Sequence, residues 1–165
     1  MRAVIFLLSG LILVASCRNE TEPKISDKDI TLVSDKDGSL ASPPYNVEFN
    51  EKTQRLSLIR SNESLEGADL NAIISSINKK YQDIKLNLVK AGRDTIELKI
   101  DDARQLTQGM GSTGAEAYLA EVTYSLTELK GVKAVKIDFE EGDHAMPGTF
   151  TRADFKALTD SAKSK

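Results

Sequence analysis

The feature that most constrains the fold is a pair of apolar stripes at helical spacing. Segments in which apolar and polar residues alternate, as in strands, lie around them. Apolar side chains recur every three or four residues between 70 and 81, and again between 115 and 129. Alternation of apolar and polar residues, which indicates half-buried strands, occupies four segments: 54–60, 84–88, 96–100 and 132–139. From residue 54 onward the sequence therefore predicts the order strand, helix, strand, strand, helix, strand.

This order limits the possible architectures. Two amphipathic helices bury their stripes when both pack on one face of a mainly antiparallel sheet of about four strands. We therefore expect an α+β fold, a two-layer sandwich with βαββαβ topology. The chain has no Trp, and aromatic residues make up 5% of it, so Leu, Ile and Val must supply most of the core.

Local signals predict where these elements begin and end. Asp69 can cap the first helix, and Thr113 with Glu116 matches a T-x-x-E capping box for the second. Gly131 stands where a left-handed C-terminal cap belongs. The turn at 91–94 is expected to join two strands into a hairpin.

Two further stretches have weaker signals. The glycine-rich stretch 109–114 lacks the lysine of a P-loop, and we expect a flexible connector there rather than a phosphate site. After a loop, Thr151 and Asp154 can cap a short helix that holds Phe155 and Leu158.

The N-terminus resembles a bacterial lipoprotein signal. Arg2 precedes an apolar run at 4–14 that is too short to span a membrane, and small residues lead into Cys17, the only cysteine. Val14-Ala15-Ser16-Cys17 matches the lipobox of such signals, which makes Cys17 the expected lipidated residue. An ordinary signal peptide with an accidental cysteine and an uncleaved anchor are the alternatives.

This resemblance implies a division of the chain and a location. Residues 1–16 form the signal peptide, 17–28 a polar tether, 29–160 one domain and 161–165 a tail. Acyl chains on Cys17 would hold the protein on a membrane of the cell envelope without crossing it. Arg18 after the cysteine, in place of Asp, favours the outer membrane if the cell has one.

The charge of the chain limits the classes of partner that it can bind. The formal net charge is −3, and no basic patch with interleaved aromatic residues is present, which argues against nucleic acid. The same acidic balance argues against attachment to anionic lipid by electrostatics alone. The expected partners are therefore the membrane, through Cys17, and proteins of the envelope.

The C-terminal half carries a family resemblance. The residues that carry this resemblance are 101–110, Gly111-Ser112-Thr113-Gly114, 120–129, and Gly131-Val132 followed by Val135 and Ile137. This run resembles the GerMN domain, whose pattern is a glycine- and serine-rich loop, a helix ending in T-L-T-x-F, a G-V-x-x-V turn and a strand. Here Ser125-Leu126-Thr127-Glu128-Leu129 ends the helix. About forty residues match well, and the chain from residue 30 matches loosely.

The resemblance also has a departure and several implications. Asn78-Lys79-Lys80-Tyr81 stands where the family's first helix usually ends in a Leu-rich segment with Gly-Pro. The family is named from sporulation and germination proteins and occurs in envelope lipoproteins. It implies no enzymatic activity and no cofactor, but an assembly role through an envelope partner or self-association. The open sheet edges and the exposed side of the 113–129 helix are the expected contact surfaces.

One acidic loop could bind a ligand. It contains the only histidine and four carboxylates, and these residues are Asp138, Glu140, Glu141, Asp143 and His144. Their spacing fits no EF-hand, and zinc would need ligands from elsewhere in the chain. A solvated loop, a weak cation site and a recognition loop are the three interpretations, and no metal is assigned.

Catalysis has few candidates. The chain has one histidine, no free thiol once Cys17 is lipidated, and no Ser-centred nucleophile elbow. Glu140 and Asp143 could serve as acid and base on a glycan, but four Tyr and no Trp leave few platforms for a sugar. We therefore expect a non-enzymatic envelope module, with a ligand- or cation-binding lipoprotein and then a glycan hydrolase as alternatives.

Overall fold

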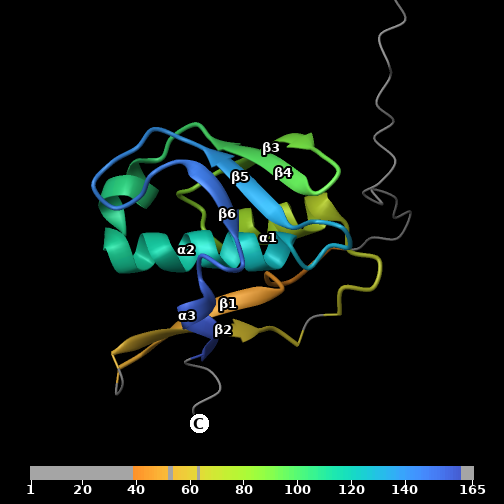
Figure 1. Ribbon diagram of the computed structural model, residues 1–165, viewed down its shortest axis with the longest axis horizontal. Coiled ribbons are helices and arrows are strands. Elements are labelled where there is room, and N and C mark those ends of the chain that lie inside the picture. Colours follow the sequence, from red (N-terminus) through yellow and green to blue (C-terminus); the bar gives the residue numbers. More distant parts are fainter. Residues whose placement is uncertain (1–38, 52–53, 63, 161–165) are drawn as a thin grey trace, which may run out of the picture.

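The chain forms three layers, with helices between a four-stranded sheet and a two-stranded hairpin (Figure 1). The computed structural model describes residues 39–51, 54–62 and 64–160. In chain order the elements are β1 (Tyr45–Asn50), β2 (Arg55–Arg60), α1 (Leu70–Lys80), β3 (Leu86–Ala91), β4 (Thr95–Ile100), the π-helix η1 (Gln105–Gly109), α2 (Gly111–Leu126), β5 (Ala134–Asp138), β6 (Gly148–Thr151) and α3 (Lys156–Asp160).

The main sheet has the strand order β3-β4-β5-β6. The β3–β4 and β5–β6 pairs are antiparallel, whereas β4 and β5 are parallel because α2 crosses over between them. These findings confirm the predicted α+β class and the mainly antiparallel sheet of four strands.

The first strand predicted for the main sheet, segment 54–60, is not part of that sheet. Segment 54–60, as β2, pairs with β1 in the separate hairpin, and β6 from the predicted C-terminal loop takes the fourth place in the sheet. Strand β2 cannot reach the sheet because α2 lies between them (Figure 1). Strand β6 can pair with β5, and its Phe150 lies opposite Val135. The hairpin therefore adds a third layer to the predicted sandwich.

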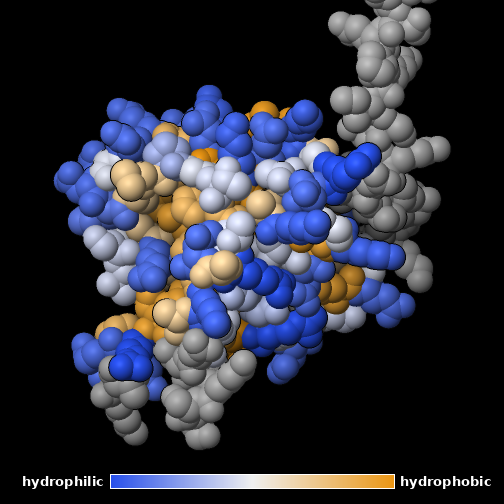
Figure 2. All heavy atoms as spheres, in the orientation of Figure 1, coloured by the Kyte–Doolittle hydropathy of each residue, from blue (hydrophilic) through white to orange (hydrophobic). Residues whose placement is uncertain are grey.

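The first helix forms as its sequence predicts. The Asp69 carboxylate accepts a hydrogen bond of 2.8 Å from the Ala72 N–H, which confirms the predicted N-cap. Its apolar stripe is buried, at Leu70, Ile73, Ile74 and Ile77. On the face shown in Figure 2, hydrophilic residues cover much of the surface, and hydrophobic residues show between them.

The predicted start of the second helix is wrong. Helix α2 begins at Gly111 after Met110, and no side chain caps it, so the Thr113–Glu116 capping box does not form. The Met110 N–H donates to the Gln105 carbonyl at 3.0 Å, which closes the last turn of η1 directly before α2. Stretch 109–114 is therefore the end of η1 and the first turn of α2, not a connector, and Gly111 allows the junction through a φ of 69°.

Helix α2 has no exposed side in its second half. Every residue from Tyr118 to Leu126 is buried, including Glu121, Thr123 and Ser125. The sheet covers one side of the helix, and β1 of the hairpin covers the other (Figure 1). The expectation that an exposed side of the 113–129 helix contacts partners is therefore wrong over these residues.

Polar contacts hold the hairpin on α2. The backbone N–H of Tyr45 donates to the Ser125 hydroxyl at 3.2 Å, and that of Val47 donates to the Glu121 carboxylate at 3.3 Å. Near the end of α2, Glu128 accepts from Arg60 at 3.0 Å and from Arg152 at 2.7 Å. The hairpin is therefore fastened by side chains of α2 and not by a ladder to the main sheet.

Two predicted helix-capping signals in the C-terminal part of the chain, at Gly131 and at Thr151 with Asp154, do not cap helices in the structure. Gly131 has a positive φ of 93°, but the prediction that it caps the second helix is wrong, because α2 ends at Leu126 and Thr127 is its C-cap. Thr151 donates to Asp154 from its N–H and its hydroxyl, but this turn lies before α3, which begins only at Lys156. Leu158 lies in this helix as predicted, whereas Phe155 lies just before it, and both are buried.

Part of the sequence analysis lies outside the described residues. This part comprises the signal peptide 1–16, Cys17, the tether 17–28 and the tail 161–165. Within residues 39–51, 54–62 and 64–160, no helix is long and apolar enough to cross a membrane.

Candidate functional site

The carboxyl ends of β4 and β5 bring most of the acidic candidates to one edge of the sheet. The two strands are parallel, and Lys99 pairs with Asp138 at their last register position. The segments that follow them therefore start side by side. We call this edge the acidic end, and its carboxylates are Asp101, Asp102, Asp138, Glu140, Glu141 and Asp143.

The π-helix η1 holds the acidic end in place. The Ala103 carbonyl accepts from both the N–H and the hydroxyl of Thr107, at 2.8 and 2.9 Å. The Thr107 carbonyl in turn accepts from the His144 N–H at 3.1 Å, which ties the 138–144 loop to η1. A Cβ on Gly142 would lie 2.7 Å from the Thr107 Cβ, so glycine permits this close approach. Single π-helical turns are frequent at functional sites.

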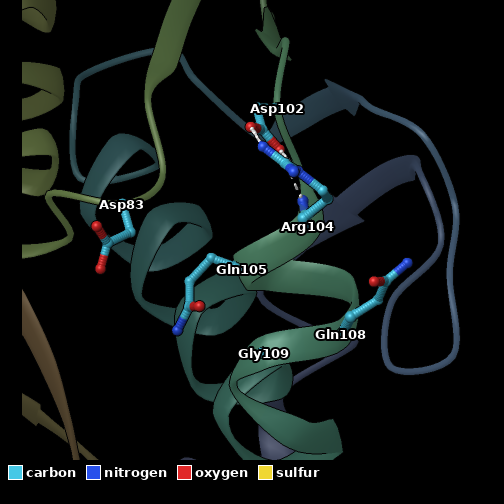
Figure 3. Close-up of a pocket in the computed structure, with 6 residues that line it drawn as sticks. All are labelled: Asp83, Asp102, Arg104, Gln105, Gln108 and Gly109. Atoms are coloured by element: carbon cyan, nitrogen blue, oxygen red, sulfur yellow. Dashed lines mark hydrogen bonds and ion pairs between the residues drawn. The ribbon is translucent and has the colours of Figure 1, made fainter.

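A hollow of about 480 Å³ opens beside η1 (Figure 3). Its lining residues are Asp83, Asp102, Arg104, Gln105, Gln108 and Gly109. In Figure 3, Gln105 and Gln108 point in opposite directions from η1, and Asp83 comes from the segment between α1 and β3. Carboxylates, amides and a guanidinium offer both donors and acceptors, which suits a polar ligand or the backbone of a bound peptide.

Asp102 and Arg104 form a fixed charge pair at the rim of this hollow. The guanidinium donates to both carboxylate oxygens, at 2.9 and 2.5 Å. These bonds, and then the bond from the Arg104 backbone N–H, lower the pKa of Asp102 to about 2. Asp102 is therefore ionised and carries its negative charge beside the Arg104 guanidinium, so the rim offers a charge pair to a polar ligand.

The structure places the other predicted loop residues without forming a metal cage. Asp138, Glu140, Glu141 and Asp143 are exposed, and the His144 ring lies 3.1 Å from the Ser112 hydroxyl, measured at Nδ1. Among the residues that the structure describes, no three His, Cys, Asp or Glu side chains are grouped to hold a metal ion.

The sequence does not predict the hollow, because a π-helix has no recognisable spacing. Its lining residues outside the predicted sites include Asp83, Arg104, Gln105 and Gln108. A usable signal was present in Asp101 and Asp102, which follow an alternating strand directly. Charged residues at a strand end indicate an exposed sheet edge.

A second carboxylate, Glu121, was also missed, although Tyr118, Glu121, Ser125 and Glu128 recur at helical spacing. Its side chain is fully buried. It accepts from Lys80 Nζ at 2.7 Å, from the Tyr81 hydroxyl at 3.1 Å and from the Val47 N–H at 3.3 Å. Burial, with the Glu121 charge, raises the pKa of Tyr81. Because protein groups enclose this carboxylate, it holds the layers together and cannot reach a substrate.

The comparisons with known proteins give one family. The family model Germane, described as sporulation and spore germination, matches residues 33–143. It is the GerMN family that the C-terminal half of the sequence resembles. The match includes the hairpin, both long helices and the acidic end, and it ends before β6. No curated protein and no solved structure matches the chain.

Proposed function

Because the chain belongs to the Germane family of sporulation and spore germination, we propose that it is a lipid-anchored, non-enzymatic assembly module of the bacterial cell envelope. The family description relates the chain to sporulation or germination. The finer proposal adds an anchor at Cys17 and a protein partner.

The acidic end is the observation that carries the proposal. It combines exposed carboxylates with a polar hollow, and hydrogen bonds from η1 hold both in place. Preorganisation of a surface lowers the conformational-entropy cost of binding a partner. Asp102 is locked to Arg104, and Glu121 is enclosed, so neither is placed for turnover. We therefore propose that a protein with a basic surface docks on the acidic end.

Crosslinking in cells tests the partner. Reversing the loop charges with Glu140→Lys, Glu141→Lys and Asp143→Lys should remove the crosslinked envelope partner from an affinity pull-down read by mass spectrometry, because like charges would then repel. A matched variant reverses three exposed carboxylates elsewhere, at Glu48, Glu51 and Glu66, and should keep the partner. Equal recovery with both variants would contradict docking at the acidic end.

The hollow also supports a second candidate function, a lipoprotein that binds a small polar ligand at the acidic end. Its lining residues are exposed and polar apart from Gly109, so it is an open depression that offers hydrogen-bonding groups to a polar ligand. In the crosslinking experiment, a lane without any partner for the unmodified protein would favour this candidate over assembly.

The anchor has its own test. Cys17→Ser should abolish incorporation of labelled palmitate in growing cells, because serine cannot form the thioether that carries the lipid. Ser9→Ala in the same apolar run is the matched control and should leave labelling unchanged. Palmitate that persists in the Cys17→Ser protein would overturn the anchor.

A further inference from the structure

We propose that the β1–β2 hairpin is a cover that opens from α2 as one unit, and that the C-terminal segment 152–160 is a strap that holds it shut. The four-stranded sheet and both long helices stay folded when the cover opens. The domain then has two states, one with the face of α2 beneath the hairpin buried and one with that face in water. This device is a property of the fold and does not depend on the anchor at Cys17.

The hairpin has few buried apolar contacts of its own. Strands β1 and β2 pair only with each other among the strands of the described residues. Leu58 is the one buried residue in the two strands, and Phe49 is 50% exposed. In β4, by contrast, Ile96, Leu98 and Ile100 are all buried. An isolated two-stranded hairpin is marginally stable, so the closed position of this one depends on the groups that hold it.

The face of α2 beneath the hairpin is polar. Three side chains of this face accept hydrogen bonds from the hairpin: Glu121, Ser125 and Glu128. Water can replace the donors of the hairpin when these side chains are uncovered. Glu121 also has two partners outside the hairpin, Lys80 Nζ at 2.7 Å and the Tyr81 hydroxyl at 3.1 Å. Opening therefore leaves no buried charge without a partner, which removes the main obstacle to exposing a face that carries a carboxylate.

Arg152, in the turn after β6, is the centre of the strap. Its guanidinium lies over the rings of Tyr45 and Tyr124, 5.5 and 4.9 Å from their centroids, and donates to the Glu128 carboxylate at 2.7 Å. Glu128 also accepts from the Tyr45 hydroxyl at 3.3 Å and from Arg60 at 3.0 Å. One arginine thus holds the first residue of β1 and the carboxylate that binds the last residue of β2.

The rest of the strap is fixed on both sides. The Arg152 Nε donates to the Thr127 hydroxyl at 2.8 Å, and its backbone carbonyl accepts from the Tyr124 hydroxyl at 3.1 Å, so this residue is attached firmly to α2. Helix α3 follows and packs against β2 (Figure 1). The family match to residues 33–143 ends before this segment. The strap therefore lies outside the part of the chain that defines the family, at the place from which the hairpin can be controlled.

Hydrogen–deuterium exchange of the purified full-length chain tests the cover. The amides of β1 and β2 should exchange as one group, at least about 100-fold faster than those of β4 and β5, because the hairpin opens without unfolding of the sheet. Arg152→Gln should speed the exchange of the hairpin about tenfold further and leave β4 and β5 unchanged. Arg104→Gln, which removes an arginine paired with Asp102 instead, should change neither.

A thiol reports directly whether α2 is uncovered. Ser125→Cys places a thiol beneath the hairpin, and Val135→Cys places one in β5; both positions are fully buried. With Cys17→Ser in each protein, a thiol reagent should modify position 125 and not position 135 in the absence of denaturant. Arg152→Gln should raise the rate at position 125 about tenfold.

Each part of the proposal can fail separately. A single exchange rate for hairpin and sheet, or a thiol at position 125 that reacts no faster than one at position 135, would overturn the cover. Equal acceleration of the hairpin and the sheet by Arg152→Gln, or the same acceleration by Arg104→Gln, would overturn the strap.

Discussion

Leu126→Asp is expected to abolish the folded domain. Leu126 is fully buried near the end of α2, in the core cluster formed by the helices and the main sheet. The substitution removes an apolar side chain whose burial contributes about 1.5–3 kcal/mol, and it places an unpaired carboxylate in the core. Burying that charge costs several kcal/mol more, against a total stability of about 5–15 kcal/mol. Thermal unfolding followed by circular dichroism should show no cooperative transition.

Val89→Asp is the matched control. It introduces the same charge at a β-strand residue that is 61% exposed. Surface substitutions of this kind usually change stability by less than about 0.5 kcal/mol, so its Tm should stay within a few degrees of the unmodified protein. If Leu126→Asp unfolds at the same temperature as Val89→Asp, the central place of α2 in the core is wrong.

Glu121→Ala is expected to destabilise the protein by about 3–5 kcal/mol, the usual cost of removing one partner from a buried ion pair. The substitution leaves the Val47 N–H and the Tyr81 hydroxyl without their acceptor. Lys80 loses its counter-charge as well, but its side chain is 34% exposed and can turn toward water, which favours the lower part of this range. The loss should concentrate on the attachment of the hairpin to α2.

Urea unfolding measures this effect. With a slope of about 1–3 kcal/mol per molar urea, the midpoint should fall by more than about 1 M. Glu116→Ala removes an exposed carboxylate from the same helix and should leave the midpoint almost unchanged. A common midpoint for the two variants would show that the Glu121 contacts do not stabilise the fold.

These two variants also bear on function. Because the hairpin covers α2, the helix of the family pattern is a structural element of this protein over Tyr118–Leu126. At the acidic end, Asp101 and Asp102 are paired with Lys99 and Arg104, and the exposed carboxylates of the 138–144 loop are the groups that the proposed function offers to a partner.

The sequence by itself determined the elements whose signals are local. The stripe of α1, the Asp69 cap and the turn at 91–94 all formed as predicted. Each depends on residues within a few positions of one another, where helical or strand periodicity and backbone preference act directly. For the same reason the α+β class followed from the order of these elements.

Only the tertiary structure decided the rest. The capping box at Thr113 failed because the chain enters α2 directly from η1, and β6 joined the sheet because β5 offered it an open edge. The hairpin buried the second face of α2 through Glu121 and Ser125, which lie more than seventy residues from their partners on β1. The hollow formed because the connection from α1 to β3, which carries Asp83, lies beside the segment that follows β4. Such contacts join residues distant in sequence, and no local periodicity encodes which of them will meet.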